Sequence, residues 1–222
     1  MVDHEPCLLA LVDRVKVHVK GGPTEPETKT LPAHKKNPEI GDKKTVFASD
    51  LLMEQYDAAL FGDNEEITAM DWGNAYVRKI VKADGGKVDS LELELHLEGD
   101  VKKTSKKVHW LSQPASGLVP VTLIDYDYLI NKKKIEGDDD FTAVLNPVTE
   151  YRVKALADAN VVGLKKFDII QFERKGFYIY QGTKDSEGRM EFGFIPESVW
   201  LAKAKNSHAL TWSHLACIQR TS

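Results

Sequence analysis

The sequence predicts an all-β protein: two antiparallel β-barrels, a proximal and a distal one, in tandem with few short helices. Apolar and charged residues alternate in short runs, as at residues 15–19 and 91–97. A period of two places the apolar side chains on one face of a half-buried antiparallel strand. Turn sequences such as Gly21-Gly22-Pro23 separate the runs at sheet-like spacing. A length of 222 residues allows one large all-β domain or two small ones.

The strands are expected in two series. Three consecutive runs predict a meander joined by tight turns, at residues 75–82, 88–98 and 108–111. Four later runs repeat the pattern, at residues 119–126, 167–174, 177–181 and 189–195. Between the series, the small, polar, proline-containing segment 112–117 is the best internal boundary. Closure into barrels would protect the strand edges, and residues 140–145 form a short capped helix candidate.

The composition is that of an ordinary soluble protein, with 42% hydrophobic and 29% charged residues. Its net charge of −4 by itself says little for nucleic acid, because such domains are often basic. The two cysteines, Cys7 and Cys217, lie at opposite ends and fit a reducing compartment rather than a disulfide framework. No apolar stretch approaches the roughly 18 residues of a membrane span. We expect a cytoplasmic protein with no membrane partner.

Familiar catalytic motifs are missing from the sequence. It contains no Walker A loop, GxGxxG, GxSxG, HExxH or CxxC. His34, His109 and His208 are scattered without an obvious carboxylate or cysteine partner, which is typical of surface or half-buried histidines. Residues 138–140, three aspartates, could bind a divalent cation, but such a triplet is more often a solvated turn that ends in a helix cap. We therefore predict no catalytic residue and no metal site in this chain.

Basic residues occur in four clusters: Lys35-Lys36 with Lys43-Lys44, Lys102-Lys103 with Lys106-Lys107, Lys132-Lys133-Lys134, and Lys165-Lys166 with Arg174-Lys175. A single cluster usually marks a solvated face. Four clusters in a net-acidic chain favour phosphate contacts on one face, with acidic residues keeping the remainder soluble.

One of these clusters adjoins Gln171. On a regular strand Gln171 and Arg174 would lie on opposite faces, but a bulge or turn at Lys175-Gly176 could bring both towards one ligand. An amide and a guanidinium can together satisfy a base edge, and proteins read the exposed base edges of single-stranded RNA. Taken alone, this pattern indicates RNA binding only weakly.

A set of motifs resembles the anticodon-binding region of eukaryotic and archaeal glutamyl-tRNA synthetases, which are related to the glutaminyl enzymes. The matching segments follow the family's order and run from about residue 12 to 203: 12–15, 21–23, 32–41, 70–75, 108–111, 139–141, 145–147 and 171–177. Glutaminyl enzymes share the loop around His34 and the Gln171-Phe172-Glu173-Arg174 motif. They typically lack Asp71-Trp72-Gly73, so this tripeptide favours glutamate specificity.

The resemblance implies a division into domains. It assigns residues 1–115 to the proximal barrel, with a returning segment at 188–205, and residues 116–187 to the distal barrel. Residues 206–222 are a tail of uncertain order. The parent enzyme would be a class I glutamate–tRNA ligase whose catalytic domain, expected in cis and absent from this chain, uses ATP and Mg²⁺. Alone, the chain is expected to hold no cofactor and to be inactive.

The resemblance also implies site residues. In the glutaminyl branch the positions that match Gln171 and Arg174 contact the middle anticodon base, a uridine that glutamate anticodons share. We carry these two residues over as anticodon readers of tRNA for glutamate. Candidate contacts to the RNA backbone are Lys35, Lys36, Lys132, Lys133, Lys134 and Lys175. The segment 61–66 differs from the relatives, so readers of the other anticodon bases are not carried over.

Rival interpretations remain open at this point. The chain could be the anticodon-binding region of a glutaminyl enzyme, or a free-standing ribosomal-type barrel that binds structured RNA. It could also be an independent hydrolase or metal enzyme that uses residues 138–140 and a histidine. The segment 102–107 resembles the lysine-serine-lysine loop of class I catalytic domains, but no His-Ile-Gly-His-like element precedes it. Phosphate contact is the better interpretation of that loop.

Overall fold

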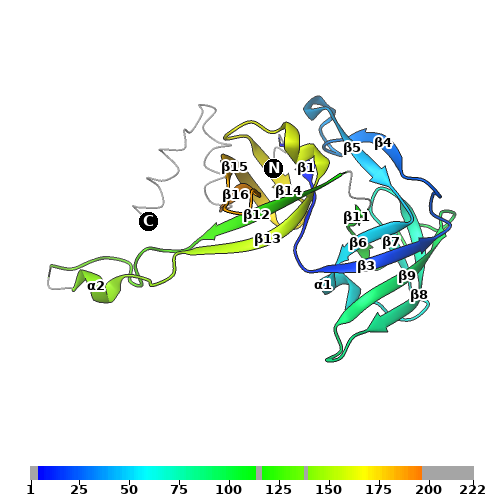
Figure 1. Cartoon of the computed structure of the whole chain (residues 1–222), viewed down its shortest axis with the longest axis horizontal. Helices are drawn as coiled ribbons and strands as arrows, with labels where there is room; N and C mark the ends of the chain where they lie inside the picture. Colours follow the sequence, from blue (N-terminus) through cyan, green and yellow to red (C-terminus); the bar gives the residue numbers. More distant parts are fainter. Residues whose placement is uncertain (1–4, 114–116, 138–139, 197–222) are drawn as a thin grey trace.

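The computed structural model describes residues 5–113, 117–137 and 140–196. Two seven-stranded sheets curl into barrel-like shapes that lie side by side, and a two-stranded hairpin lies beside them (Figure 1). The helices of the described part are single turns. This confirms the predicted all-β fold of two barrels with few short helices. The sheets are not wholly antiparallel, because β3 (Arg14–Lys20) pairs in parallel with β9 (Val88–His96), and β12 (Leu118–Tyr126) with β16 (Met190–Ile195).

The first sheet is drawn from the first half of the chain. Its strands lie in the order β10 (Lys107–Val108), β7 (Glu66–Ala69), β8 (Gly73–Lys82), β9 (Val88–His96), β3 (Arg14–Lys20), β6 (Asp50–Glu54) and β11 (Leu111–Ser112). Strand β3 alternates strictly between exposed polar residues and the buried β-branched Val15, Val17 and Val19. The period-two prediction for this strand is confirmed, since branched side chains suit a pleated, half-buried surface.

The predicted meander is only partly correct. Strands β8 and β9 form an antiparallel hairpin, but the other neighbour of β9 is β3, with Val17 opposite Leu91. Residues 107–112 split into β10, which pairs with β7, and β11, which pairs with β6. Between them the buried Trp110 donates its Nε1–H to the carbonyl oxygen of Met70 at 2.8 Å. Trp110 thus ties the link between β10 and β11 to the core.

The second sheet combines the second half of the chain with two short N-terminal strands. Its order is β1 (Cys7–Leu8), β14 (Ile169–Phe172), β15 (Gly176–Lys184), β16 (Met190–Ile195), β12 (Leu118–Tyr126), β13 (Glu150–Asp158) and β2 (Ala10–Leu11). The placement of residues 190–195 in the first barrel was wrong, because β16 pairs with β12 and β15. Conversely, residues 7–11 pair with the second sheet. Residues 197–222, including the predicted tail, lie outside the described residues.

Strand β13 had no counterpart in the predicted series. Its first five residues are all exposed, so the alternation that reveals a half-buried strand is missing there. Figure 1 shows the reason: the β12–β13 ribbon runs out beyond the sheet into an arm, residues 127–137 and 140–149, that carries α2 (Phe141–Val144). Asp140 caps α2 by accepting the Thr142 N–H at 2.9 Å, as predicted for this short helix. Asp138 and Asp139 lie outside the described residues.

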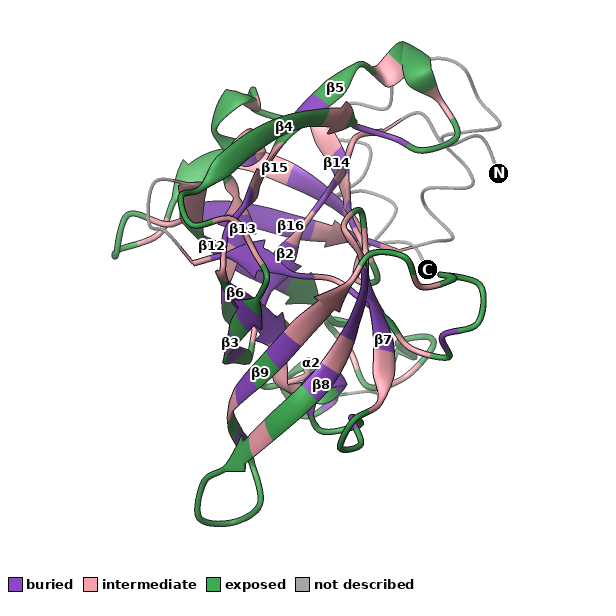
Figure 2. Cartoon of the chain, turned by 90° about the vertical axis from the view of Figure 1, so that its right-hand side faces the viewer, coloured by how far each residue is buried: buried purple, intermediate pink, exposed green. Residues whose placement is uncertain are grey.

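The hairpin β4 (Glu27–Pro32) and β5 (Asp42–Phe47) bends over the junction between the sheets, with η1 (Pro38–Ile40) in its loop. The turns α1 (Gln55–Ala58) and η3 (Ala159–Gly163) follow β6 and β13. Figure 2 shows buried residues recurring along the strands of both sheets, whereas β4 is largely exposed.

Each sheet encloses its own apolar core. A third, smaller cluster joins them, in which buried Leu11, Leu52 and Leu111 come from β2, β6 and β11 and pack against partly buried Leu156 of β13. This apolar seam fixes the two barrels relative to each other, because separating them would return those leucines to water.

Candidate nucleic-acid interface

A cleft of about 330 Å³ lies where the two sheets and the β4–β5 hairpin meet. Its wall includes Gln171 and Arg174 from the second sheet and Lys35 and Lys36 from the hairpin loop. The structure therefore brings together four of the eight predicted site residues. The other polar members of the wall are Cys7, His34, Lys43, His109 and Glu173. Lys43 belongs to the predicted basic cluster of Lys35 and Lys36, whereas the remaining four had no predicted part in ligand binding.

The turn after β14 explains how Gln171 and Arg174 come to share one wall. The strand ends at the fully buried Phe172, and the Lys175 N–H closes the turn on the Phe172 carbonyl at 2.9 Å. Arg174 has φ +67° and Gly176 has φ +112°, so the alternation of faces stops here. Arg174 consequently leaves the buried face of Phe172 and reaches the cleft, as the turn hypothesis predicts. A Cβ on Gly176 would lie 2.9 Å from the Phe194 ring.

Glu173, at the start of the turn, is held by His109 of the first barrel and Lys43 of the β4–β5 hairpin. Its Oε2 lies 2.6 Å from Nε2 of His109, and its Oε1 accepts from Nζ of Lys43 at 3.2 Å. Burial alone would raise the pKa of Glu173, but the His109 hydrogen bond and the Lys43 charge outweigh it and lower this pKa to about 2. His109 thus has the carboxylate partner that was not evident in the sequence.

Arg174 and Lys175 are also paired across the junction. Nη1 and Nη2 of Arg174 donate to the two oxygens of Asp57 at 2.5 and 2.9 Å. This bond raises the pKa of Arg174 above its usual value. Lys175 donates to Glu54 at 2.5 Å and its side chain is only 18% exposed. Lys175 therefore faces the first barrel and presents little surface to a ligand.

The hairpin loop presents Lys35 and Lys36 at the rim of the cleft. Nζ of Lys35 lies 2.7 Å from the Asp71 carboxylate, while the Lys36 N–H donates to Nδ1 of the buried His34 at 3.2 Å. Asp71 itself has φ +64°, and the neighbouring Trp72 packs against the rings of two other residues, Phe47 and Trp110. The Asp71-Trp72-Gly73 element thus anchors the lysine loop to the first barrel.

Lys132, Lys133 and Lys134 lie elsewhere. They belong to the connection between β12 and β13, which Figure 1 shows extending away from both sheets. The structure does not bring these three lysines to the cleft, so any contact they make with RNA involves a different part of the ligand.

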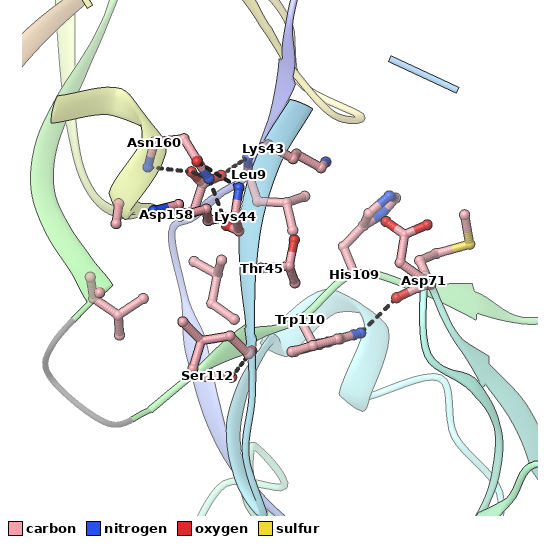
Figure 3. A pocket seen from close by; sticks show the side chains of 16 residues that line it. Leu9, Lys43, Lys44, Thr45, Asp71, His109, Trp110, Ser112, Asp158 and Asn160 are labelled. Atoms are coloured by element: carbon pink, nitrogen blue, oxygen red, sulfur yellow. Dashed lines mark hydrogen bonds between the residues drawn. The ribbon is translucent and has the colours of Figure 1, made fainter. Parts of the chain in front are cut away.

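Behind the cleft a narrower pocket of about 50 Å³ shares Lys43 and His109 with it. Figure 3 shows His109, Asp71 and Trp110 on one side and Asp158 with Asn160 on the other. Asp158 accepts the Leu9 N–H at 2.8 Å and both nitrogens of Asn160, and burial raises its pKa. These contacts join the link between β1 and β2 to the end of β13 and the start of η3. Among the described side chains, Nδ1 of His109 is the buried polar atom without a hydrogen-bond partner.

The remaining motifs have structural explanations within the described residues. The loop 102–107 joins β9 to β10, where Thr104 is buried against Thr68 and Lys106 pairs with Glu65 at 2.5 Å. The described part holds no group of three His, Cys, Asp or Glu residues arranged for a metal ion. It also contains no helix long and apolar enough to cross a membrane.

Comparison with known proteins gives consistent results. Two consecutive segments, residues 7–97 and 107–181, match the family description "tRNA synthetases class I (E and Q), anti-codon binding domain". The probable cytoplasmic glutamate–tRNA ligase of Schizosaccharomyces pombe is 52% identical over 176 residues, 78% of this chain and 24% of that protein. The cytoplasmic glutamate–tRNA ligase of Saccharomyces cerevisiae is 45% identical over 175 residues, 78% and 24% of the respective chains.

A more distant relative is the bifunctional glutamate/proline–tRNA ligase of Mus musculus, 34% identical over 175 residues, which are 78% of this chain and 12% of that protein. The chain belongs to the anticodon-binding domain family of class I tRNA synthetases for glutamate and glutamine. Within that family, the relatives named above are glutamate–tRNA ligases, of whose length this chain spans a quarter or less. The resemblance found in the sequence is confirmed.

Proposed function

We propose that this chain is the anticodon-reading part of a cytoplasmic glutamate–tRNA ligase. A class I catalytic domain in cis would bind ATP and Mg²⁺ and carry out the aminoacylation. The two barrels would grip the anticodon loop, and binding there would position the acceptor end of the tRNA in the catalytic domain. The names of the relatives support glutamate as the amino acid and the cytoplasm as the location.

The observation that carries this proposal is the composition of the cleft. Gln171 offers an amide and Arg174 a guanidinium, a pair that can bond the edge of an unstacked base. Lys35 and Lys36 lie at the same cleft and would contact phosphates, which position the RNA without reading its sequence. A base-reading pair flanked by phosphate-binding lysines fits a single-stranded loop.

The remaining lysines take lesser parts in this proposal. Lys132, Lys133 and Lys134 would contact phosphates outside the anticodon loop, because the arm extends away from the cleft. Lys175 would reach RNA only by leaving Glu54, so we assign it mainly to the junction of the barrels.

The proposal is tested by the affinity of the chain for transfer RNAs. Transcripts of tRNA for glutamate, glutamine and an amino acid whose anticodon has a different middle base would be compared by fluorescence anisotropy. We expect the glutamate tRNA to bind more tightly than the unrelated tRNA. A preference for glutamine tRNA would favour the glutaminyl alternative, and equal binding of all three would contradict anticodon reading.

A further inference from the structure

Asp57 belongs to the first barrel, yet it bonds the residue that we propose as a base reader in the second. It lies on α1, directly after β6, and its side chain is only 7% exposed. Both of its carboxylate oxygens accept from Arg174, at 2.5 and 2.9 Å. The contact is thus a bidentate, charge-assisted pair, the arrangement in which a guanidinium is held most firmly in one orientation.

The pair leaves Arg174 able to bind a further ligand. A guanidinium has five N–H donors, and the bond to Asp57 uses one on each terminal nitrogen. Three donors remain, the Nε–H and one on each terminal nitrogen. The Arg174 side chain is 39% exposed and lines the cleft beside Gln171. A base edge could therefore be bonded while the ion pair stays intact.

The support for Arg174 is itself anchored. Glu54, three residues before Asp57 in the same segment, bonds Lys175 at 2.5 Å and accepts from the Val12 N–H at 3.3 Å. Two carboxylates from one short segment thus hold two consecutive residues of the reading turn. An arginine that is already oriented loses less side-chain entropy when a ligand binds.

We propose that Asp57 is a positioning residue for base recognition, which holds Arg174 in the orientation that reads the middle anticodon base. This inference rests on the proposed function, because it requires that Arg174 contacts a base. It adds a residue from the first barrel to a reading site otherwise built from the second.

The test measures affinity for two RNAs by fluorescence anisotropy. One is a stem-loop with a glutamate anticodon, and the other has cytidine in place of the middle uridine. The proteins are the wild-type chain, Asp57→Asn, Arg174→Ala and the double variant. We expect Asp57→Asn to lower the affinity for the uridine RNA about tenfold, within the range of one specific base contact. The affinity for the cytidine RNA should change by less than about twofold. The double variant should bind both RNAs with the affinity of Arg174→Ala.

Glu191→Gln is the matched control, since it removes a largely buried carboxylate that bonds an arginine, Arg152, within the second sheet and leaves the cleft and the Arg174 pair in place. Its preference for uridine over cytidine should equal that of the wild-type chain. If Asp57→Asn does not fold, Asp57→Glu replaces it in the test, because it keeps the carboxylate charge but places it on a side chain one methylene longer. It should lower the uridine preference, and an unchanged preference would overturn the proposal.

Other outcomes separate the two proposals. Asp57 would have a purely structural role in either of two cases. Asp57→Asn could lower the affinity for both RNAs equally, or it could lower the affinity of the Arg174→Ala variant by as much as that of the wild-type chain. Tighter binding of the uridine RNA by Asp57→Asn would mean that the ion pair withholds Arg174, which also overturns positioning. If Arg174→Ala itself keeps the uridine preference, the base-reading role of Arg174 fails. If Asp57→Asn keeps the uridine preference but Arg174→Ala loses it, the base-reading role of Arg174 stands and the positioning role of Asp57 fails.

Discussion

Oε2 of Glu173 lies 2.6 Å from Nε2 of His109, 64 residues earlier in the chain, and this contact ties the reading turn to the other barrel. Lys43 bonds the second carboxylate oxygen. Because the Glu173 side chain is only 18% exposed, the surrounding charges act on it with little screening by solvent.

This contact predicts a specific dependence of stability on pH. The pKa of Glu173 is lowered from 4.5 to about 2 in the folded protein. Its contribution to folding is therefore fully present above about pH 4.5 and is lost as the pH falls towards 2. We expect Glu173→Gln to reduce the free energy of unfolding at pH 7 by on the order of 3 kcal/mol. Urea unfolding of both proteins at several pH values measures this.

The difference between wild type and Glu173→Gln should shrink as the pH falls from about 4.5 towards 2. In this range the unfolded wild-type chain binds a proton at Glu173, whereas the folded protein keeps the carboxylate ionised until the pH approaches 2. A difference that stays constant down to pH 3 would show that the ionised carboxylate is not what stabilises the junction.

Substitution of Arg174 tests base reading directly. Arg174→Ala should weaken binding of tRNA with the middle uridine by about 1–3 kcal/mol, the range for a specific side-chain–base contact. The effect should be smaller on tRNA whose middle base is changed, because the contact is already lost there. Equal losses on both tRNAs, measured by the same titration, would reduce Arg174 to a backbone contact.

Two groups of lysines should differ in the kind of binding they support. Replacing Lys35 and Lys36 by alanine should weaken the binding of an isolated anticodon stem-loop. It should also make the negative slope of log K against log salt shallower by about 2, if each lysine neutralises one phosphate. Lys134→Ala should instead lower the affinity for full-length tRNAs about equally, whatever their middle anticodon base. A salt-independent affinity of the wild-type chain would contradict phosphate contacts altogether.

Gly176 offers a test of the turn geometry. Gly176→Ala places a Cβ 2.9 Å from Phe194 at φ +112°, whereas a Cβ on Gly188, at φ +81°, would meet no atom within 4 Å. Gly188→Ala should therefore cost only about 1 kcal/mol of stability, for the backbone alone. Gly176→Ala should cost on the order of 3 kcal/mol and should also lower RNA affinity. Thermal unfolding of the two variants measures the backbone and steric strain, and RNA titration measures the distortion of the site.

The purified chain should not catalyse ATP–pyrophosphate exchange when glutamate and tRNA are supplied. The physical reason is that its sequence contains no recognisable phosphate-binding loop for ATP. Measurable exchange above the background of a heat-treated sample would overturn the assignment of catalysis to another domain.

Local pattern in the sequence determined several features by itself. Alternation at 15–19 predicted the buried valines of β3, because a pleated strand turns successive side chains to opposite faces. The capped turn at Asp140 followed from local hydrogen-bonding chemistry. The ordered set of motifs identified the family, and the motif at Gln171 and Arg174 supplied two members of the cleft. The exposed half of β13 gave no alternation, and this strand was missed.

The tertiary structure alone decided which strands are neighbours and which charges meet. The alternating pattern of a strand specifies its buried face but not its partner. For this reason β16 lies in the other barrel from the one predicted, and one of the two neighbours of β9 differs from the prediction. Asp57 and Arg174 are 117 residues apart, and each is an unremarkable charge in its own segment. They meet only because the leucine seam and the turn after β14 fix the two barrels against each other, which no local pattern encodes.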